Sequence, residues 1–168
     1  MKRLLTLYRQ PGLDLSGTTL VRKAYRAIIA RGDRYLLVQS KKYGEIKFPG
    51  GGREAHERAF DVLRREVAEE TGYAIHRRII PFGSTLEYAK DFEQKFDIFL
   101  QLSHYYFCRV HETIQPLALE GYEIEYGYEP LWMTAEEALK INQSIPANDR
   151  IPWKERDTQI MMLLVKGR

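Results

Sequence analysis

One segment, residues 50–72, constrains the fold more than any other part of the chain. It opens with three consecutive glycines, Gly50 to Gly52, which let the backbone approach a neighbouring group closely. Apolar residues then recur at the spacing of one helix face: Phe60, Leu63 and Val67. This pattern predicts an amphipathic helix over 57–71, and Gly72 directly after it suits a left-handed cap. The chain must therefore turn on glycine and enter a helix that packs on one side.

Three carboxylates share one side of this predicted helix. At about 100° per residue, Glu66, Glu69 and Glu70 fall within an arc of roughly 100° beside the apolar stripe. Like charges this close repel one another, so a bound cation would replace repulsion with attraction. Clustered hard oxygen ligands suit Mg²⁺ or Mn²⁺. Arg65 lies four residues before Glu69, and its planar fork can orient a carboxylate through two bonds.

The preceding glycine turn adds a second chemical preference to the segment. A glycine-rich turn that leads into a helix favours anions, because free N–H groups and the helix dipole point there. Carboxylates beside such a turn are typical of a site where a divalent metal bridges protein and phosphate oxygens. Taken singly, an acidic helix face is usually just solvated and a glycine run is usually just a flexible turn. Only the joint spacing separates these alternatives.

The rest of the chain predicts strands alternating with helices, which indicates a mixed α/β layer structure. Two strands, 21–30 and 35–39, flank a Gly-Asp turn, and further strands are expected within 73–110. Residues 111–130 are acidic and predict a loop, followed by a short strand at 131–133. The remaining expectations are a helix opened by the Thr134 capping box, a last helix over about 152–166, and an irregular or edge segment over 1–19.

Composition limits what class of protein this is. The chain has 168 residues, 44% of them hydrophobic, and a formal net charge of +3. This length and composition predict one domain, 1–168, with a core over about 20–150 and extensions at both ends. No apolar run is long enough to span a membrane, and the small net charge gives little support for nucleic-acid binding. The lone Cys108 and the lack of a signal segment predict a cytoplasmic protein.

The joint spacing from Gly51 to Tyr73 matches Gly-x5-Glu-x7-Arg-Glu-U-x-Glu-Glu-x-Gly-U, where U is a bulky apolar residue. The fixed positions are Gly51, Glu57, Arg65, Glu66, Val67, Glu69, Glu70 and Gly72, and only Tyr73 departs from a strict aliphatic. This segment resembles the Nudix box, the signature of the Nudix hydrolase family. The resemblance implies an α+β fold, an α/β/α sandwich with a mixed β-sheet.

The resemblance also implies a chemistry. Nudix enzymes hydrolyse a nucleoside diphosphate linked to another moiety, by attack of water on phosphorus. Glu66, Glu69 and Glu70 would ligate Mg²⁺ or Mn²⁺, with the Gly51 carbonyl as a further ligand. Glu57 would pair with Arg65 at the start of the helix or join the outer ligands of the metal. The general base would be a box glutamate or one of four on the downstream loop, of which Glu129 is favoured: Glu120, Glu123, Glu125 and Glu129.

Substrate choice is less defined by the sequence. Phe48, Gly50 and Arg53 flank the predicted turn and are expected to contact substrate. Tyr88 lies close to where family members acting on diadenosine polyphosphates place a tyrosine, whereas the proline typical of ADP-ribose hydrolases is absent. Nucleoside triphosphates, nucleotide sugars and dinucleoside polyphosphates all stay open as substrates, and a homodimer is compatible with the sequence.

Three other functions compete with that of a hydrolase of small nucleotides. A nucleotide sensor without catalysis would usually lose box carboxylates, and this chain keeps them. An RNA-end pyrophosphohydrolase would need a basic stripe beside the site. An isomerase of isoprenoid diphosphates would need a catalytic cysteine, and Cys108 within an apolar strand is more typical of a buried small hydrophobe.

Overall fold

A mixed β-sheet forms the middle layer of the protein. The computed structural model describes residues 1–167, and within them the main sheet runs in the order β1-β7-β8-β2-β3-β10, with β4 beside β3 and β5 beside β2. Its strands are β1 (Arg3–Tyr8), β2 (Thr19–Arg31), β3 (Arg34–Ser40), β4 (Ile46–Lys47), β5 (Gly50–Gly52), β7 (Ile80–Ala89), β8 (Ile98–Cys108) and β10 (Tyr128–Thr134). β1 pairs with β7 and β2 with β8 in parallel, whereas the other pairs are antiparallel. A separate antiparallel pair joins β6 (Tyr73–Ile75) to β9 (Val110–Ile114).

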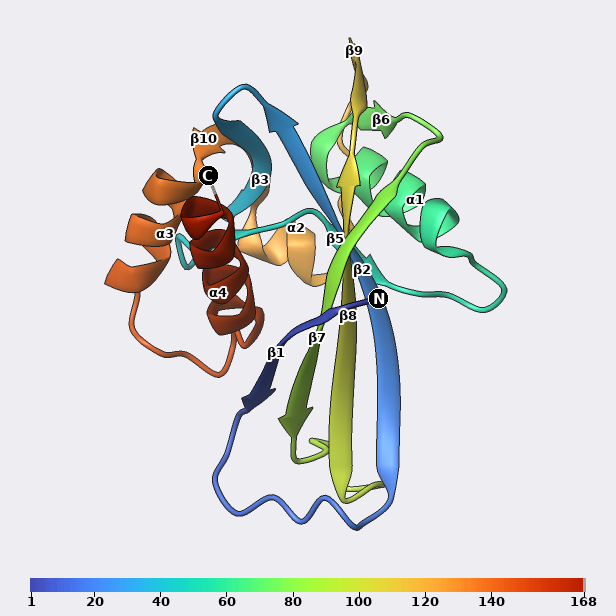
Figure 1. Cartoon of the computed structure of the whole chain (residues 1–168), viewed down its shortest axis with the longest axis vertical. Helices are drawn as coiled ribbons and strands as arrows, with labels where there is room; N and C mark the ends of the chain where they lie inside the picture. The colour runs from blue at the N-terminus through green and yellow to red at the C-terminus, as the bar shows by residue number, and fades with distance from the viewer. Residues whose placement is uncertain (168) are drawn as a thin grey trace.

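Helices cover both faces of this sheet. The helices are α1 (Ala59–Thr71), α2 (Tyr122–Tyr126), α3 (Ala135–Ser144) and α4 (Trp153–Lys166). Figure 1 shows α1 on one side and α3 with α4 on the other. Alternation along β2 explains the two cores: Ile28 packs with the residues of α3 and α4, whereas Ala27 and Ile29 pack with those of α1. The predicted α/β/α sandwich with a mixed sheet is confirmed.

Most of the expected elements are present. The predicted helix over 57–71 is α1, and Gly72 closes it with a φ of +73° and an N–H bond to the Ala68 carbonyl. Thr134 begins α3 with the expected reciprocal capping box, its hydroxyl accepting from the Glu137 N–H. The segment expected to be irregular or an edge contains β1, which lies at one edge of the main sheet. None of the helices within residues 1–167 is long and apolar enough to cross a membrane.

The prediction of a loop over 111–130 is wrong in part, because this stretch contains most of β9, all of α2 and the start of β10. Four of the five β9 residues are exposed, so the strand shows no buried alternation, and its partner β6 has only three residues. α2 has five residues, too few to show helical periodicity in a sequence.

A buried polar network ties α4 to the sheet. Arg156 donates from Nη1 to Glu87 Oε2 at 3.0 Å, and Arg9 of the segment after β1 bonds the other oxygen of Glu87. Asp157 accepts from the Tyr105 hydroxyl at 2.6 Å and from the Phe48 N–H at 3.2 Å. The second contact fixes the chain just before the glycine run, so the C-terminal helix helps to position the turn that opens the site.

Candidate active site

The glycine run lies against the acidic face of α1. Gly50 has a φ of +133°, and a Cβ there would collide with the Tyr25 carbonyl of β2. In this conformation the Gly50 N–H donates to Glu70 Oε2 at 2.7 Å. At Gly51 a Cβ would overlap the carboxylate of Glu66. Gly50 is therefore required by its backbone conformation and the close Tyr25 carbonyl, and Gly51 by the space that the Glu66 carboxylate occupies.

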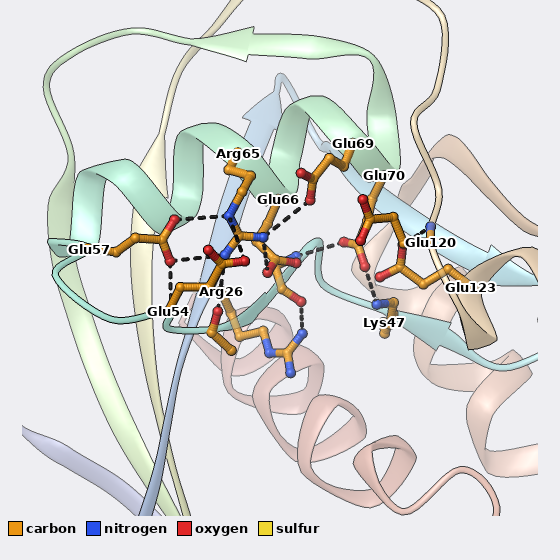
Figure 2. A network of polar contacts seen from close by, with 12 residues as sticks. Arg26, Lys47, Glu54, Glu57, Arg65, Glu66, Glu69, Glu70, Glu120 and Glu123 are labelled. Atoms are coloured by element: carbon orange, nitrogen blue, oxygen red, sulfur yellow. Dashed lines mark hydrogen bonds and ion pairs between the residues drawn. The ribbon is translucent and has the colours of Figure 1, made fainter.

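Arg65 holds the start of the site together. Its Nε and Nη2 donate to the two oxygens of Glu57 at 2.9 and 3.0 Å, as Figure 2 shows. Its Nη1 donates to Glu66 Oε1 at 2.7 Å and to Glu69 Oε2 at 3.2 Å. The bonded guanidinium lowers the pKa of Glu57, and these carboxylates raise the pKa of Arg65, with Glu57 contributing most. Both oxygens of Glu57 are occupied, since Oε2 also accepts from the Glu54 N–H, so Glu57 positions α1 and the turn.

Three carboxylates converge beyond Arg65. Each of Glu66, Glu70 and Glu123 offers an oxygen, and the three oxygens lie within 4.8 Å of one another. Glu66 and Glu70 are buried in α1, and Glu123 reaches them from α2 (Figure 2). Burial raises the pKa of Glu66, and the charge of Glu70 adds to the effect. Burial together with the charge of Glu70 raises the pKa of Glu123 to about 7. Carboxylates held this close together at a buried site are the donor set that a divalent metal prefers.

One cation of the chain already lies inside this cluster. The Lys47 ammonium forms an ion pair with Glu70 Oε1, and both side chains are almost fully buried. It also lies over the Tyr128 ring, 4.3 Å from the centroid. Lys47 thus brings a positive charge from β4 among the carboxylates.

The downstream loop supplies a different glutamate from the one the sequence favoured. Glu123 is half-buried in the cluster, whereas Glu129 is exposed on β10 and pairs with Lys41 at 2.5 Å. Glu123, rather than the favoured Glu129, therefore lies among the box glutamates, and which of the two acts as the general base stays a prediction. Glu69 lies at the edge of the site, where its side chain is 26% exposed and bonds Arg65.

Two of the expected substrate contacts lie elsewhere. The Phe48 ring is buried in the α3–α4 core, edge-on to Tyr105, so it presents no surface for stacking. Tyr88 stacks on Tyr8 of β1 with centroids 5.3 Å apart. Its neighbour Glu87 faces α4, so strand alternation turns Tyr88 to the opposite face of the sheet. Both expectations are corrected, because each ring is used in packing.

Gly50 and Arg53 remain beside the site, in different ways. The Gly50 N–H is committed to Glu70, so it does not point at a substrate. Arg53 is exposed just after the turn, and its backbone N–H bonds the Lys23 carbonyl at 3.0 Å. Its charge acts on the nearby Glu57, and its contact with substrate stays a prediction.

Sequence reasoning missed two strand residues and one aromatic residue at the site. Arg26 bonds the Gly50 carbonyl from β2. Arg22 lies four residues earlier, so it is on the same face of β2. It lies next to Gly52 and within electrostatic range of Glu66 and Tyr122. Tyr122 begins α2 beside Glu123 and is 48% exposed. The only sequence signal for the two arginines was their alternate spacing on a strand that leads to the box.

Comparisons with known proteins agree with this geometry. A family model of the NUDIX domain matches residues 20–154. Among solved structures, a NUDIX hydrolase from Nitrosomonas europaea superposes with a TM-score of 0.56 at 19% identity, covering 83% of this chain and 88% of that one. The ORF135 protein of E. coli gives a TM-score of 0.56 at 24% identity, covering 88% and 93%. A MutT protein from Bacillus halodurans gives 0.53 at 20%, covering 84% and 80%.

At these identities the solved structures show a shared fold. A comparison with curated proteins gives no match. The family model spans the turn, α1, α2 and the sheet between them, which are the parts that assemble the carboxylate cluster. The chain belongs to the Nudix family and is a hydrolase that acts on phosphoric anhydride bonds.

Proposed function

We propose that this chain hydrolyses the pyrophosphate linkage of a small nucleotide derivative with Mg²⁺ or Mn²⁺ as cofactor. The observation that carries the proposal is the convergence of Glu66, Glu70 and Glu123 against a turn whose Gly51 leaves no room for a side chain. Glu66 and Glu70 would hold the metal, with the Gly51 carbonyl and Glu69 at the edge of the set and Glu123 left to act on the attacking water. When bound, a divalent cation neutralises charge on the phosphates and makes water a better nucleophile.

The residues of the chain have separate tasks in this proposal. Arg65 fixes Glu66 and Glu69 relative to the turn. Glu123 comes from a different element than the box glutamates, so it can face an attacking water while Glu66 and Glu70 hold charge. Arg22 and Arg53 border the turn and would bind the phosphate groups on either side of the cleaved bond.

Tyr122 is the aromatic side chain best placed to stack on a nucleobase. It lies next to Glu123 and is 48% exposed, while its ring packs edge-on against Tyr126 and Tyr128. An aromatic base laid on such a supported ring gains both apolar burial and stacking. Its position favours a substrate with a nucleoside on the α2 side of the phosphates.

The test of the proposed function is a substrate panel in Mg²⁺ and in Mn²⁺. It contains deoxynucleoside triphosphates, oxidised purine nucleotides, nucleotide sugars, ADP-ribose, NADH and diadenosine polyphosphates, with release of phosphate or monophosphate measured. Glu70→Gln should lower turnover at least about a hundredfold, because it removes a ligand charge. Glu112→Gln, on exposed β9, should leave turnover unchanged. Equal turnover by the wild type, Glu70→Gln and Glu112→Gln would show that the cluster takes no part in the mechanism.

A paired comparison tests which loop glutamate acts in catalysis. Glu123→Gln should reduce kcat at least about a hundredfold, since its carboxylate faces the cluster. Glu129→Gln should change kcat less than about threefold, since its carboxylate pairs with Lys41 in solvent. The reverse order would restore the preference that the sequence suggested.

We place the enzyme in the cytoplasm, in keeping with a single, buried and unpaired cysteine. The substrate in this proposal is a small molecule, and a homodimer stays a prediction that size-exclusion chromatography with light scattering can check.

A further inference from the structure

We propose that Lys47 is the resident counter-ion of the carboxylate cluster, which a divalent cation displaces from Glu70 toward the buried carboxyl group of Glu45. This inference rests on the proposed function, because it concerns how the same cluster changes between its metal-free and metal-bound states. Three features of the protein support it: Lys47 is buried, both oxygens of Glu70 have partners, and the buried Glu45 carboxylate beside them has none.

Lys47 is buried so deeply that its charge must be stabilised by an ion pair. Its side chain is 3% exposed and that of Glu70 is 1% exposed. An ammonium group so far from water needs a charged partner, and the carboxylates need a cation equally. Without a metal, Lys47 therefore stabilises the cluster by offsetting the repulsion among Glu66, Glu70 and Glu123.

Each oxygen of Glu70 already has a partner in the metal-free protein. Its Oε1 is paired with the Lys47 ammonium, and its Oε2 accepts from the Gly50 N–H at 2.7 Å. The Gly50 donor is fixed, because a backbone turn at a φ of +133° and the pairing of β5 with β2 hold it. The ammonium, in contrast, sits on four flexible carbons. A divalent cation bound by Glu70 would repel the Lys47 ammonium but not the neutral Gly50 N–H, so Lys47 is the partner that moves.

Glu45 provides the place to which Lys47 can move. It is fully buried, and within residues 1–167 neither of its oxygens accepts a hydrogen bond. Ile46 and Phe48 both pack into the α3–α4 core, so the alternate residues Glu45 and Lys47 share the other side of the chain. Alternate residues of an extended chain are about 6.6 Å apart, which a lysine side chain spans. Burial raises the pKa of Glu45, and its neighbours Ser40 and Trp153 and the charge of Lys47 only partly oppose this, so the carboxyl group can accept a nearby cation.

The test measures Mn²⁺ affinity from the electron paramagnetic resonance signal of free Mn²⁺, without any substrate. Lys47→Met should bind Mn²⁺ about tenfold more tightly than the wild type, because the competing cation is gone. The same variant should melt at a lower temperature in EDTA, because Glu70 has lost its partner. A residue with a merely structural role would weaken both properties, so the opposite signs are diagnostic.

Glu45→Gln tests the second half of the proposal and leaves the ion pair of the metal-free state intact. It should weaken Mn²⁺ binding about fivefold, because the displaced ammonium loses its acceptor. In the Lys47→Met background the same change should have no effect, since no ammonium remains to be moved. This pair of variants decides the question even if Lys47→Met fails to fold without metal, because Glu45→Gln alone still has a defined effect.

Two further variants serve as controls. Lys47→Arg keeps the charge and should keep an affinity near that of the wild type. Lys42→Met removes an exposed lysine that pairs with Glu125 and should not change Mn²⁺ affinity. Weaker binding by a folded Lys47→Met, or an equal effect of Glu45→Gln in both backgrounds, would overturn the inference. If the wild type itself binds no Mn²⁺, the proposed function fails instead.

Discussion

The two glycines at the centre of the site differ in what they make possible. Gly50 provides a backbone conformation that aims an N–H group at Glu70, whereas Gly51 provides the space that the Glu66 carboxylate fills. Gly52 is the least constrained, because a Cβ there would meet the flexible end of Arg22. The glycine run is thus explained by close approach of carboxylates rather than by mobility of the turn.

This difference predicts the effect of adding one methyl group. Gly51→Ala should weaken Mn²⁺ affinity at least about tenfold, because the new Cβ overlaps the Glu66 carboxylate and forces it to move. Gly52→Ala is the matched control and should cost less than about threefold, because Arg22 can swing aside. Isothermal titration of Mn²⁺ into each protein measures both. Equal losses would show that the turn is sensitive as a whole.

Cys108 has a testable chemical property of its own. Its side chain is buried, and burial raises the pKa of its thiol to about 12. Only the thiolate attacks disulfide reagents, so the native protein should not react with Ellman's reagent at pH 8, whereas the protein in 8 M urea should react fully. Rapid reaction of the folded protein would reveal an accessible thiol and would revive an isomerase-like role for this cysteine.

Much of the site could be predicted from the sequence because it lies within one helix. Arg65, Glu66, Glu69 and Glu70 are fixed relative to one another by helical spacing. Glu123 and Lys47 could not be placed in this way, because α2 and β4 are separate elements whose position relative to α1 depends on the tertiary fold. Phe48 and Tyr88 were misplaced since a ring in the sequence does not reveal which face of a strand it occupies.

At the scale of elements, α4 belongs to the framework of the site. It contributes Ile160, Met161 and Leu164 to the larger core, and its Asp157 bonds the N–H before the glycine run. Its place at the end of the chain suggested an extension, since neither the box nor its spacing involves it. Burial of a charged pair, Arg156 and Asp157, was also outside what hydrophobic patterning can predict.

The network predicts a large loss of stability from one substitution in α4. Asp157→Ala leaves Arg156 buried without its nearest carboxylate and the Tyr105 hydroxyl without its acceptor. The free energy of unfolding should fall by about 3–5 kcal/mol. Urea denaturation measures it, with Glu155→Gln on the exposed side of α4 expected to change it by less than about 0.5 kcal/mol. A loss below 1 kcal/mol for Asp157→Ala would show that the network adds little.

For the whole molecule, stability and metal binding should be linked through the cluster. A ligand that binds only the folded state at a hundred times its Kd adds about 2.7 kcal/mol. Saturating Mg²⁺ or Mn²⁺ should therefore raise the melting temperature by roughly 5–10 °C relative to EDTA. The Glu70→Gln variant should show less than half of this shift, because one ligand charge is missing. Differential scanning fluorimetry compares the two proteins, and an equal shift in both would place the cation elsewhere.

The carboxylate of Glu87 has a consequence for any shortened version of the chain. One of its oxygens is bonded by Arg9, near the beginning of the sequence, and the other by Arg156, near the end. The region that matches the family model, 20–154, contains the acid and neither of its partners. Cutting the gene to that region would leave a negative charge sealed in the interior with nothing to balance it. Both ends of the chain lie outside the match to the family model, yet both bond the same buried side chain. They should therefore be expressed with the rest.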